Sequence, residues 1–295
     1  MGIIEYARTS IKENWSLFRR SRMGLLGLAI LAFFAFLALL APIPRLIDDM
    51  YHPMVGVDPE ISYSTPPSLR HPMGTDFMGR DLLSQFLSGA QIAFAVGITA
   101  AVISVLIGTA IGLTSGYYGG KVDALLMRLA DIVLVLPGLP FIIVIAAALG
   151  KMSIWIIVLL IALLGWPGVA RVIRAQTLSL RERPFVEAAR VAGAGDRRIL
   201  LHHLAPNVLP LTFLYAALGV SGAILTEASL SFIGLGDPSV VSWGMMLQWA
   251  FTTGHTFRAP YWILPPGLAI SLLSLSFYLV GRALEEIINP RLREP

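Results

Sequence analysis

Long uncharged windows alternate with short charged connections along this chain. About 20 apolar residues in a helix cross the hydrocarbon core of a bilayer, and six windows reach or approach that length. The windows cover residues 24–41, 82–120, 132–150, 152–170, 204–226 and 259–281. The pattern therefore predicts an all-α integral membrane protein with six transmembrane helices.

Composition agrees with a membrane protein. Of the 295 residues, 56% are hydrophobic and 14% are charged, whereas a soluble domain carries about a quarter charged residues. The absence of cysteine excludes disulfides and thiolate metal sites. A net charge of +4 is too small to indicate nucleic-acid binding. We therefore expect a lipid membrane, and no nucleic acid, among the partners.

The distribution of lysine and arginine predicts the orientation of the helices, because cytoplasmic loops are enriched in these residues. With the N-terminus in the cytoplasm, seventeen of the 22 lysines and arginines lie inside and five outside. Both termini are therefore predicted to be cytoplasmic. The expected organisation is a cytoplasmic amphipathic N-terminal arm (1–23), a first transmembrane helix (24–41), an external proline-rich segment (42–88), a five-helix core (89–283) containing a cytoplasmic loop (182–207), and a cytoplasmic C-terminal tail (284–295).

The external segments carry turn and anchoring signals. Seven prolines between residues 42 and 72 favour extended, turning backbone rather than an independent domain. Asp81 is well placed to cap the helix that follows. The aromatic residues predicted to anchor at the membrane interface are Trp243, Trp249, Tyr261 and Trp262.

The stretch "ERPFVEAARVAGAGDRRILLHHLAPN", residues 182–207, interrupts the apolar pattern with charge. Pro184 suits a first helical turn, and Glu187 falls near the positive end of the same helix dipole. Ala188 and Ala189 are small and allow another backbone to approach. Gly193 is expected to end this helix.

A second short helix is predicted after the glycines of this stretch. Asp196 is expected to cap it, with Arg197 as its first residue, and Pro206 to mark its junction with the next span. The two helices would project into the cytoplasm as a docking segment. The alternative is a solvated charged loop, which is common on that side of a membrane.

One ionisable side chain, Glu227, lies clearly inside a predicted span, in "AILTEASLSF". An acid is costly in hydrocarbon and usually faces a partner or a watery path. Two interpretations stay open: a contact lining a translocation path, or a hydrogen-bonded acid at the outer edge of the span.

No pattern of catalytic or metal-ligating residues is visible. The five histidines are scattered, without ligand or nucleophile–base spacing. The nearest sequence to a phosphate-binding loop, "SGYYGGKV" (115–122), lacks the first glycine at the right spacing and a hydroxyl residue after Lys121. We therefore expect a non-catalytic chain that binds no metal, cofactor or nucleotide itself.

Several stretches resemble a known family. "EAA" at 187–189, followed after three residues by Gly193, resembles the coupling signature of ABC importer permeases. The stretches similar to the dipeptide and oligopeptide (Dpp/Opp C-type) branch are "HPMGTDFMGRDLLS" (71–84), "GYYGGKVDALLMRLADI" (116–132), "GWPGVARVIRAQTLSL" (165–180), "HHLAPN" (202–207), "TEASLSFIGLG" (226–236), "SWGMML" (242–247) and "NPRLR" (289–293). Ala205 and Asn289 depart from the branch, where leucine and aspartate are more usual.

The resemblance implies the type I ABC importer permease fold. In that family the charged loop lies in a groove of an ATP-hydrolysing subunit and carries its motion into the membrane helices. The residues that take the ATPase-coupling positions are Glu187, Ala188, Ala189, Gly193, Asp196, His203 and Pro206.

The resemblance also implies partners: a homologous permease subunit, two ATP-binding subunits that hold ATP and magnesium, and an extracellular or periplasmic solute-binding protein, in a prokaryotic cytoplasmic (inner) membrane. Import of di- and oligopeptides is expected. Import of oligosaccharides or a nickel complex by the same machinery is the alternative. A secondary transporter is a distant alternative, because that class usually shows intramembrane acids, broken helices or two similar halves.

Overall fold

The computed structural model describes residues 16–61, 63–150 and 152–288. Within these ranges the regular elements are helices, and strand-like pairing is limited to one bridge between Thr75 and Asp81. The predicted arm is described only from residue 16 and the predicted tail only to residue 288. The amphipathic character expected of residues 1–15 therefore lies outside the described part of the chain.

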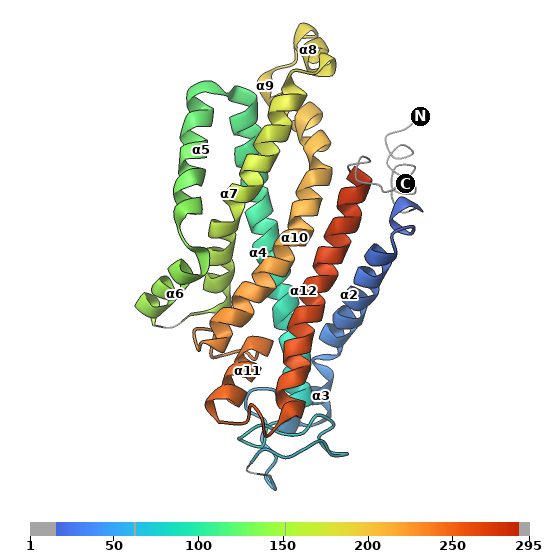
Figure 1. Cartoon of the computed structure of the whole chain (residues 1–295), viewed down its shortest axis with the longest axis vertical. Helices are drawn as coiled ribbons and strands as arrows, with labels where there is room; N and C mark the ends of the chain where they lie inside the picture. Colours follow the sequence, from blue (N-terminus) through green and yellow to red (C-terminus); the bar gives the residue numbers. More distant parts are fainter. Residues whose placement is uncertain (1–15, 62, 151, 289–295) are drawn as a thin grey trace.

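Five long helices run along the length of the molecule (Figure 1). They are α2 (Arg22–Leu40), α4 (Leu82–Tyr118), α7 (Ile154–Arg181), α10 (Ala205–Phe232) and α12 (Pro260–Ile288). All five are long and apolar enough to cross a membrane, and a bent pair of helices completes a possible sixth span. The prediction of an all-α membrane protein is confirmed, with five candidate spans, or up to six if the bent pair is one span.

The bent pair corrects one sequence prediction. Residues 132–150 are predicted as one span, but the structure divides them between α5 (Gly120–Val135) and α6 (Gly138–Leu149). The two helices are bent by 78° relative to each other. Pro137 lies at the break and its extended backbone precedes α6. The reason is that proline has no N–H to donate within a continuous helix and its ring clashes with the preceding turn.

Three glycines bring α4 and α7 into close backbone contact. Gly108, Gly112 and Gly116 recur every fourth residue and so share one face of α4. A Cβ atom at Gly112 would lie 2.6 Å from the carbonyl oxygen of Ala170 in α7. Small residues at this spacing let membrane helices pack with their backbones touching. α4 and α7 therefore form one tightly packed pair along much of their length.

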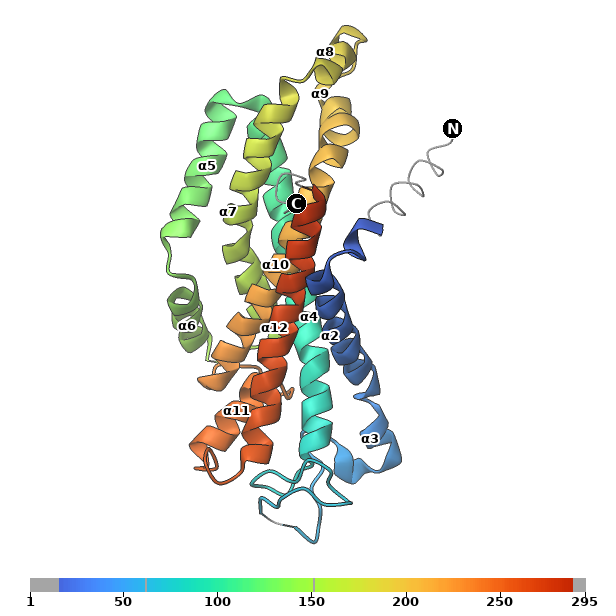
Figure 2. The same ribbon diagram turned by 45° about the vertical axis from the view of Figure 1, so that its right-hand side comes forward.

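The two ends of the bundle carry different structures (Figures 1 and 2). At one end, α3 (Ile43–Ile47), the 3-10 helix η1 (Asp49–Tyr51) and the coil up to Arg80 form a cap. At the other end, α8 (Pro184–Val191) and α9 (Asp196–Arg198) project beyond the long helices. We call these the α3 end and the α8 end. α2 begins, and α12 ends, on the side of the α8 end.

The cap largely follows the sequence prediction. Turns and coil dominate residues 48–80, as the prolines indicate. The carboxylate of Asp81 accepts a hydrogen bond from the backbone N–H of Ser84 at 2.7 Å, so the predicted helix cap is confirmed. Residues 82–88, assigned to the external segment from the sequence, form the first turns of α4.

A buried histidine holds the cap to α4. The imidazole of His71 is fully buried, with Nδ1 2.8 Å from the Asp81 carboxylate and Nε2 3.2 Å from the Asp58 carboxylate. Burial alone would raise the pKa of Asp58, but hydrogen bonds from the Glu60 N–H and from His71, together with the charge of Arg70, lower it below its usual value. The cap is therefore held to α4 by polar contacts, and its stability depends on the charge of Asp58.

Two of the predicted aromatic anchors are buried instead. Trp243, at the start of α11 (Trp243–Thr252), and Trp262, near the start of α12, are 2% and 0% exposed. The indole N–H of Trp243 donates to the carbonyl oxygen of Phe86 at 2.9 Å. The prediction that they sit at the membrane interface is therefore wrong, because other rings cover both indoles: Phe34 and Phe86 pack against Trp243, and Phe77 and His255 against Trp262.

Candidate functional site

The first helix of the charged segment forms as the sequence predicts. α8 starts at Pro184 and carries Glu187 in its first turn, where the helix dipole favours a negative charge. At its other end Gly193 has a φ of +80°, a left-handed conformation that glycine adopts without strain. The N–H of Gly193 bonds to the Arg190 carbonyl and that of Ala194 to the Ala189 carbonyl, both at 2.9 Å. Gly193 thus ends the helix.

The second half of the segment differs from the prediction. Asp196 is the first residue of α9 rather than its cap, and Gly195, which precedes it, makes no side-chain capping bond. α9 runs through the π-helix η2 (Ile199–Leu204) directly into α10, as one helical stretch from Asp196 to Phe232. α10 begins at Ala205, so Pro206 lies in its first turn, where the sequence predicts the segment to meet the next span, and the helix is continuous there.

The π-helix explains how the chain accommodates Pro206 without a break. A proline at this position has no N–H to give to the carbonyl of His202. The N–H of Ala205 instead bonds to the carbonyl of Leu200, five residues earlier, and the wider turn makes room. The side-chain amide of Asn207 donates to the His203 carbonyl at 2.5 Å. The helical stretch therefore continues from α9 into α10 past the proline.

The two faces of α8 differ. On the inner face, Val186 is fully buried and packs in an apolar cluster with Ile199 and Leu204, and Ala189 is half-buried against it. On the outer face, Glu187 and Ala188 are exposed. Phe185 and Val191 are 40% and 86% exposed. Part of the apolar surface at the tip of the molecule is thus left uncovered by the described chain.

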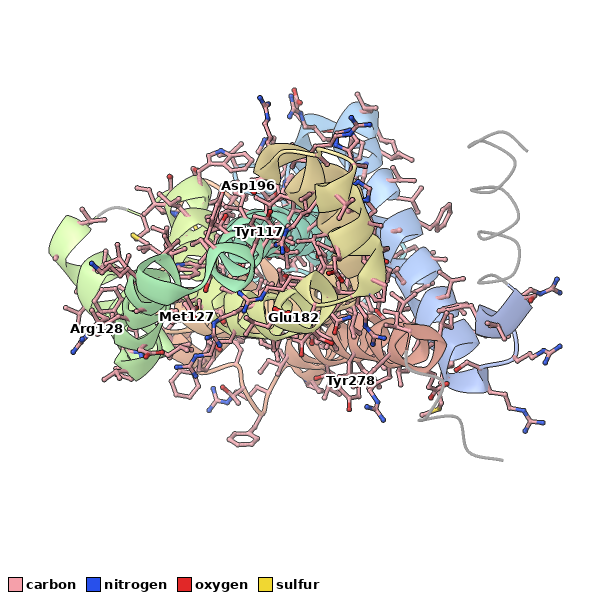
Figure 3. The ribbon with its side chains drawn as sticks, turned by 90° about the horizontal axis from the view of Figure 1, so that it is seen from above. Tyr117, Met127, Arg128, Glu182, Asp196 and Tyr278 are labelled. Carbon is pink, nitrogen blue, oxygen red and sulfur yellow. The ribbon has the colours of Figure 1, made fainter. Side chains whose placement is uncertain are left out.

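A tyrosine from α4, Tyr117, contacts both sides of the Gly193 turn. Figure 3 shows Tyr117 close to Asp196. The phenol of Tyr117 donates to the carboxylate of Asp196 in α9 at 2.7 Å. The guanidinium carbon of Arg190 in α8 lies 5.7 Å from the centre of the same ring, within the range of a cation–π interaction. Tyr117 is 7% exposed, so α4 reaches directly under the segment.

Charged residues on α5 and α7 extend this network. Arg174 of α7 binds both carboxylate oxygens of Asp123 in α5, at 2.5 Å each, and the hydroxyl of Ser115 donates to the same carboxylate. Arg181 donates to the Gly116 carbonyl near the end of α4 at 3.1 Å. The uncharged windows do not predict these partners, because a charge ends a window. The spacing of Asp123 and Arg174 along the chain gives no signal of the pairing, which depends on α5 and α7 lying side by side.

The predicted coupling residues lie within one projection. Glu187, Ala188 and Ala189 lie on α8, and Gly193 forms the turn. The others follow along the continuous helix: Asp196 in α9, His203 in η2 and Pro206 in the first turn of α10. The arrangement can present a short, rigid helix to another protein.

A cavity of about 660 Å³ lies between the middle parts of α4, α6, α7 and α10. Its lining is uncharged and mostly apolar, a mixture of small and large aliphatic side chains, with polar groups from Ser104, Tyr215 and Thr226. Residues that line it include Ala101, Ser104, Gly138, Gly165, Gly168, Tyr215, Gly219, Gly222, Ala223 and Thr226. A lining of this kind offers space but no charge with which to select a solute.

Glu227 does not line that cavity. Its side chain is 3% exposed, and its carboxylate accepts a hydrogen bond from the hydroxyl of Ser231 at 2.6 Å. This geometry agrees with a hydrogen-bonded structural acid, and the role of a path-lining contact stays a prediction. Among the described residues no group of three or more His, Asp or Glu side chains could hold a metal ion.

Comparison with known proteins identifies the family. Residues 108–294 match the family "Binding-protein-dependent transport system inner membrane component", and residues 9–52 match "N-terminal TM domain of oligopeptide transport permease C". A relative from Brucella suis biovar 1 (strain 1330) is 40% identical over 232 residues, which are 78% of this chain and 76% of its own, and its name describes a peptide permease.

Two further comparisons agree with this match. The oligopeptide transport system permease protein OppC of Haemophilus influenzae is 41% identical over 222 residues, 75% of this chain and 70% of its own. Among solved structures, the inward-facing MetNI methionine ABC transporter is similar with a TM-score of 0.53 at 18% identity, over 71% of this chain and 97% of that one, which shows a shared fold. The chain therefore belongs to the family of binding-protein-dependent transport system inner membrane components, in the branch of oligopeptide-type ABC transporter permeases.

Proposed function

We propose that this chain is the membrane subunit of an ATP-driven importer of di- and oligopeptides in a prokaryotic cytoplasmic membrane. The α8 end and both termini face the cytoplasm, and the α3 end faces outward. Family membership and the peptide-related names of the relatives support the peptide substrate. The excess of lysine and arginine on the α8 side supports the orientation.

The observation that carries the proposal is the two-faced α8 helix. Its inner face is anchored by the buried side chain of Val186, while Glu187, Ala188 and Val191 stay exposed at the tip. An exposed apolar patch bordered by charge is typical of a protein-binding surface. We assign this face to an ATP-hydrolysing partner subunit, whose closure on ATP binding moves α8.

The connections of α8 determine where that motion goes. α7 leads directly into the segment, and α9 continues without a break into α10. A displacement of α8 is therefore transmitted to two helices that line the central cavity. Opening and closing of this cavity toward each side in turn would give alternating access.

The complete transporter needs further subunits. A homologous permease subunit supplies the other half of the path, two ATP-binding subunits supply ATP and magnesium, and an external solute-binding protein delivers the substrate at the α3 end. The uncharged lining of the cavity leaves selectivity to the binding protein. This chain itself carries out no catalysis.

Native mass spectrometry of the binding protein that co-purifies with the transporter tests the substrate. A ladder of bound masses spaced by amino-acid residues is the expected result. Masses spaced by sugar units would show that the substrate is an oligosaccharide rather than a peptide. The mass of a bound nickel complex would show that the substrate is that complex. A transporter that never retains a binding protein under conditions of active uptake would contradict the importer assignment.

A further inference from the structure

We propose that Tyr117 is a positioning residue that makes α4 move together with the α8–α9 segment. The inference rests on the proposed docking of α8 to an ATP-hydrolysing subunit. It adds α4 to the two helices, α7 and α10, that are joined to the segment by the chain itself.

The contacts of Tyr117 are placed to hold the turn of the segment. Its hydroxyl group binds Asp196, which follows the turn at Gly193, and its ring faces Arg190, which precedes that turn. One side chain therefore contacts both arms of the segment. The bond to Asp196 joins a side chain of α4 directly to this segment.

The hydroxyl group distinguishes positioning from simple packing. The ring of Tyr117 also belongs to the apolar cluster of Val186 and Ile199, and a phenylalanine ring would fill the same space. The bond from the phenol to a carboxylate is directional and charge-assisted, hence stronger than a neutral hydrogen bond. It fixes the position of Asp196 relative to α4 in a way that apolar packing does not.

α4 is well suited to carry a displacement away from the segment. Its contacts with α7 through Gly108, Gly112 and Gly116 are close, and Arg181 holds its last turn. The helix is 37 residues long, which corresponds to about 55 Å. Its far end is capped by Asp81, and that carboxylate binds the buried His71 of the external cap.

α4 therefore connects the docking segment at the α8 end with the cap at the α3 end. A binding protein seated on the cap and an ATP-hydrolysing subunit seated on α8 can sense each other through this one helix. The expected signature of Tyr117 is a role in communication: stimulation of ATP hydrolysis by the substrate-loaded binding protein requires it, whereas unstimulated hydrolysis does not.

The test uses the complete transporter in proteoliposomes, with its binding protein and a labelled peptide. Tyr117→Phe keeps the ring and removes the hydroxyl group. We expect peptide uptake and stimulated ATP hydrolysis to fall about tenfold or more, the effect of one lost hydrogen bond to a charged group, with unstimulated hydrolysis within about twofold of wild type. Tyr118→Phe is the matched control, because Tyr118 is 51% exposed on the same turn and should behave as wild type.

Asp196→Ala and the double variant complete a cycle. Residues that act through each other give non-additive effects, so the double variant should be no worse than the more impaired single variant. Asp196→Asn, which keeps an acceptor oxygen, should retain more uptake than Asp196→Ala. If Tyr117→Phe assembles poorly, the comparison of these two Asp196 variants decides the proposal.

Unchanged uptake and stimulation in Tyr117→Phe and Asp196→Ala would overturn the proposal, as would fully additive losses in the cycle. Glu187→Arg separates this failure from a failure of docking. If Glu187→Arg abolishes uptake while the Tyr117 and Asp196 variants behave as wild type, only the role of Tyr117 is lost. If Glu187→Arg also transports normally, docking through α8 is itself wrong.

Discussion

Arg174 of α7 holds both carboxylate oxygens of Asp123 at the start of α5, each at 2.5 Å. The pair is partly shielded, with side-chain exposures of 32% and 17%. It ties the first turn of α5 to a helix that leads into the docking segment. α5 is therefore fixed at the α8 end, although Pro137 breaks the span further along.

Asp123→Asn should lower the stability of the purified protein by about 1–2 kcal/mol, since removing one partner leaves the other charge partly buried without compensation. Thermal unfolding in detergent should show this as a decrease in Tm. The swapped pair Asp123→Arg with Arg174→Asp should recover part of the loss. Equal Tm values for Asp123→Asn and wild type would show that the pair contributes nothing measurable.

Gly112→Ala tests the close contact of α4 with α7. The added methyl group would lie 2.6 Å from a backbone carbonyl oxygen, and forcing a methyl group into a packed interface typically costs about 1–3 kcal/mol. We expect a lower Tm. The control is Gly168→Ala in α7, where a Cβ atom meets no other atom within 4 Å and alanine favours the helix.

A Tm for Gly112→Ala equal to or above that of Gly168→Ala would contradict the glycine contact. The two variants carry the same chemical change on neighbouring helices. The difference between their Tm values therefore reports the packing at Gly112 rather than the general effect of replacing glycine in a helix.

The cap should lose stability in acid through Asp58. Its pKa is lowered in the folded protein, so its contribution is fully present above the unfolded pKa of about 3.9 and disappears as the pH falls through the lower folded value. Wild type should have a higher Tm than Asp58→Asn at pH 7. The difference between them should shrink below pH 4.

Glu60→Gln is the control for this series. Glu60 also pairs with Arg70, but its side chain is 77% exposed, and exposed pairs contribute about 0–1 kcal/mol. Its Tm should stay near the wild-type value across the series. A difference between wild type and Asp58→Asn that does not change between pH 7 and pH 3 would rule out the charge of Asp58 as the cause.

The sequence predicted the helices better than their ends. The uncharged windows located the spans because hydrocarbon excludes unpaired charge. The same rule placed the start of α5 too late and the end of α7 too early, since Asp123 and Asp131 pair with Arg174 and Arg171 on the neighbouring helix. Such pairing depends on which helices lie side by side, and spacing along one chain does not reveal that.

In the docking segment, too, the sequence predicts features set by neighbouring residues but not features set by residues distant in the chain. The start of α8 at Pro184 and its end at Gly193 were predictable, because proline and glycine act on their own backbone. The role of Asp196 and the π-helix before Pro206 were not. Asp196 binds a tyrosine 79 residues away, and the π-turn before Pro206 preserves a helix that a local rule would break.

The conformation at Gly193 can be tested separately from the surface of α8. Gly193→Ala places a side chain at a φ of +80°, a left-handed conformation that costs roughly 1–2 kcal/mol, and should loosen the turn and slow uptake. Gly195→Ala is its control, because Gly195 has a φ of −70° and open space around it. Equal uptake by the two variants would show that the turn geometry does not matter for transport.

Docking of an ATP-hydrolysing subunit requires the exposed face of α8. The decisive measurement is ATP-dependent peptide uptake by proteoliposomes that contain the complete transporter, with wild-type chain or with Glu187→Arg at equal incorporation. Glu187 is exposed, so the substitution should leave folding intact while it reverses the charge presented to the ATP-hydrolysing subunit. We expect uptake to fall about tenfold or more, which corresponds to at least about 1.4 kcal/mol of lost coupling. Wild-type uptake by the Glu187→Arg transporter would contradict docking through α8.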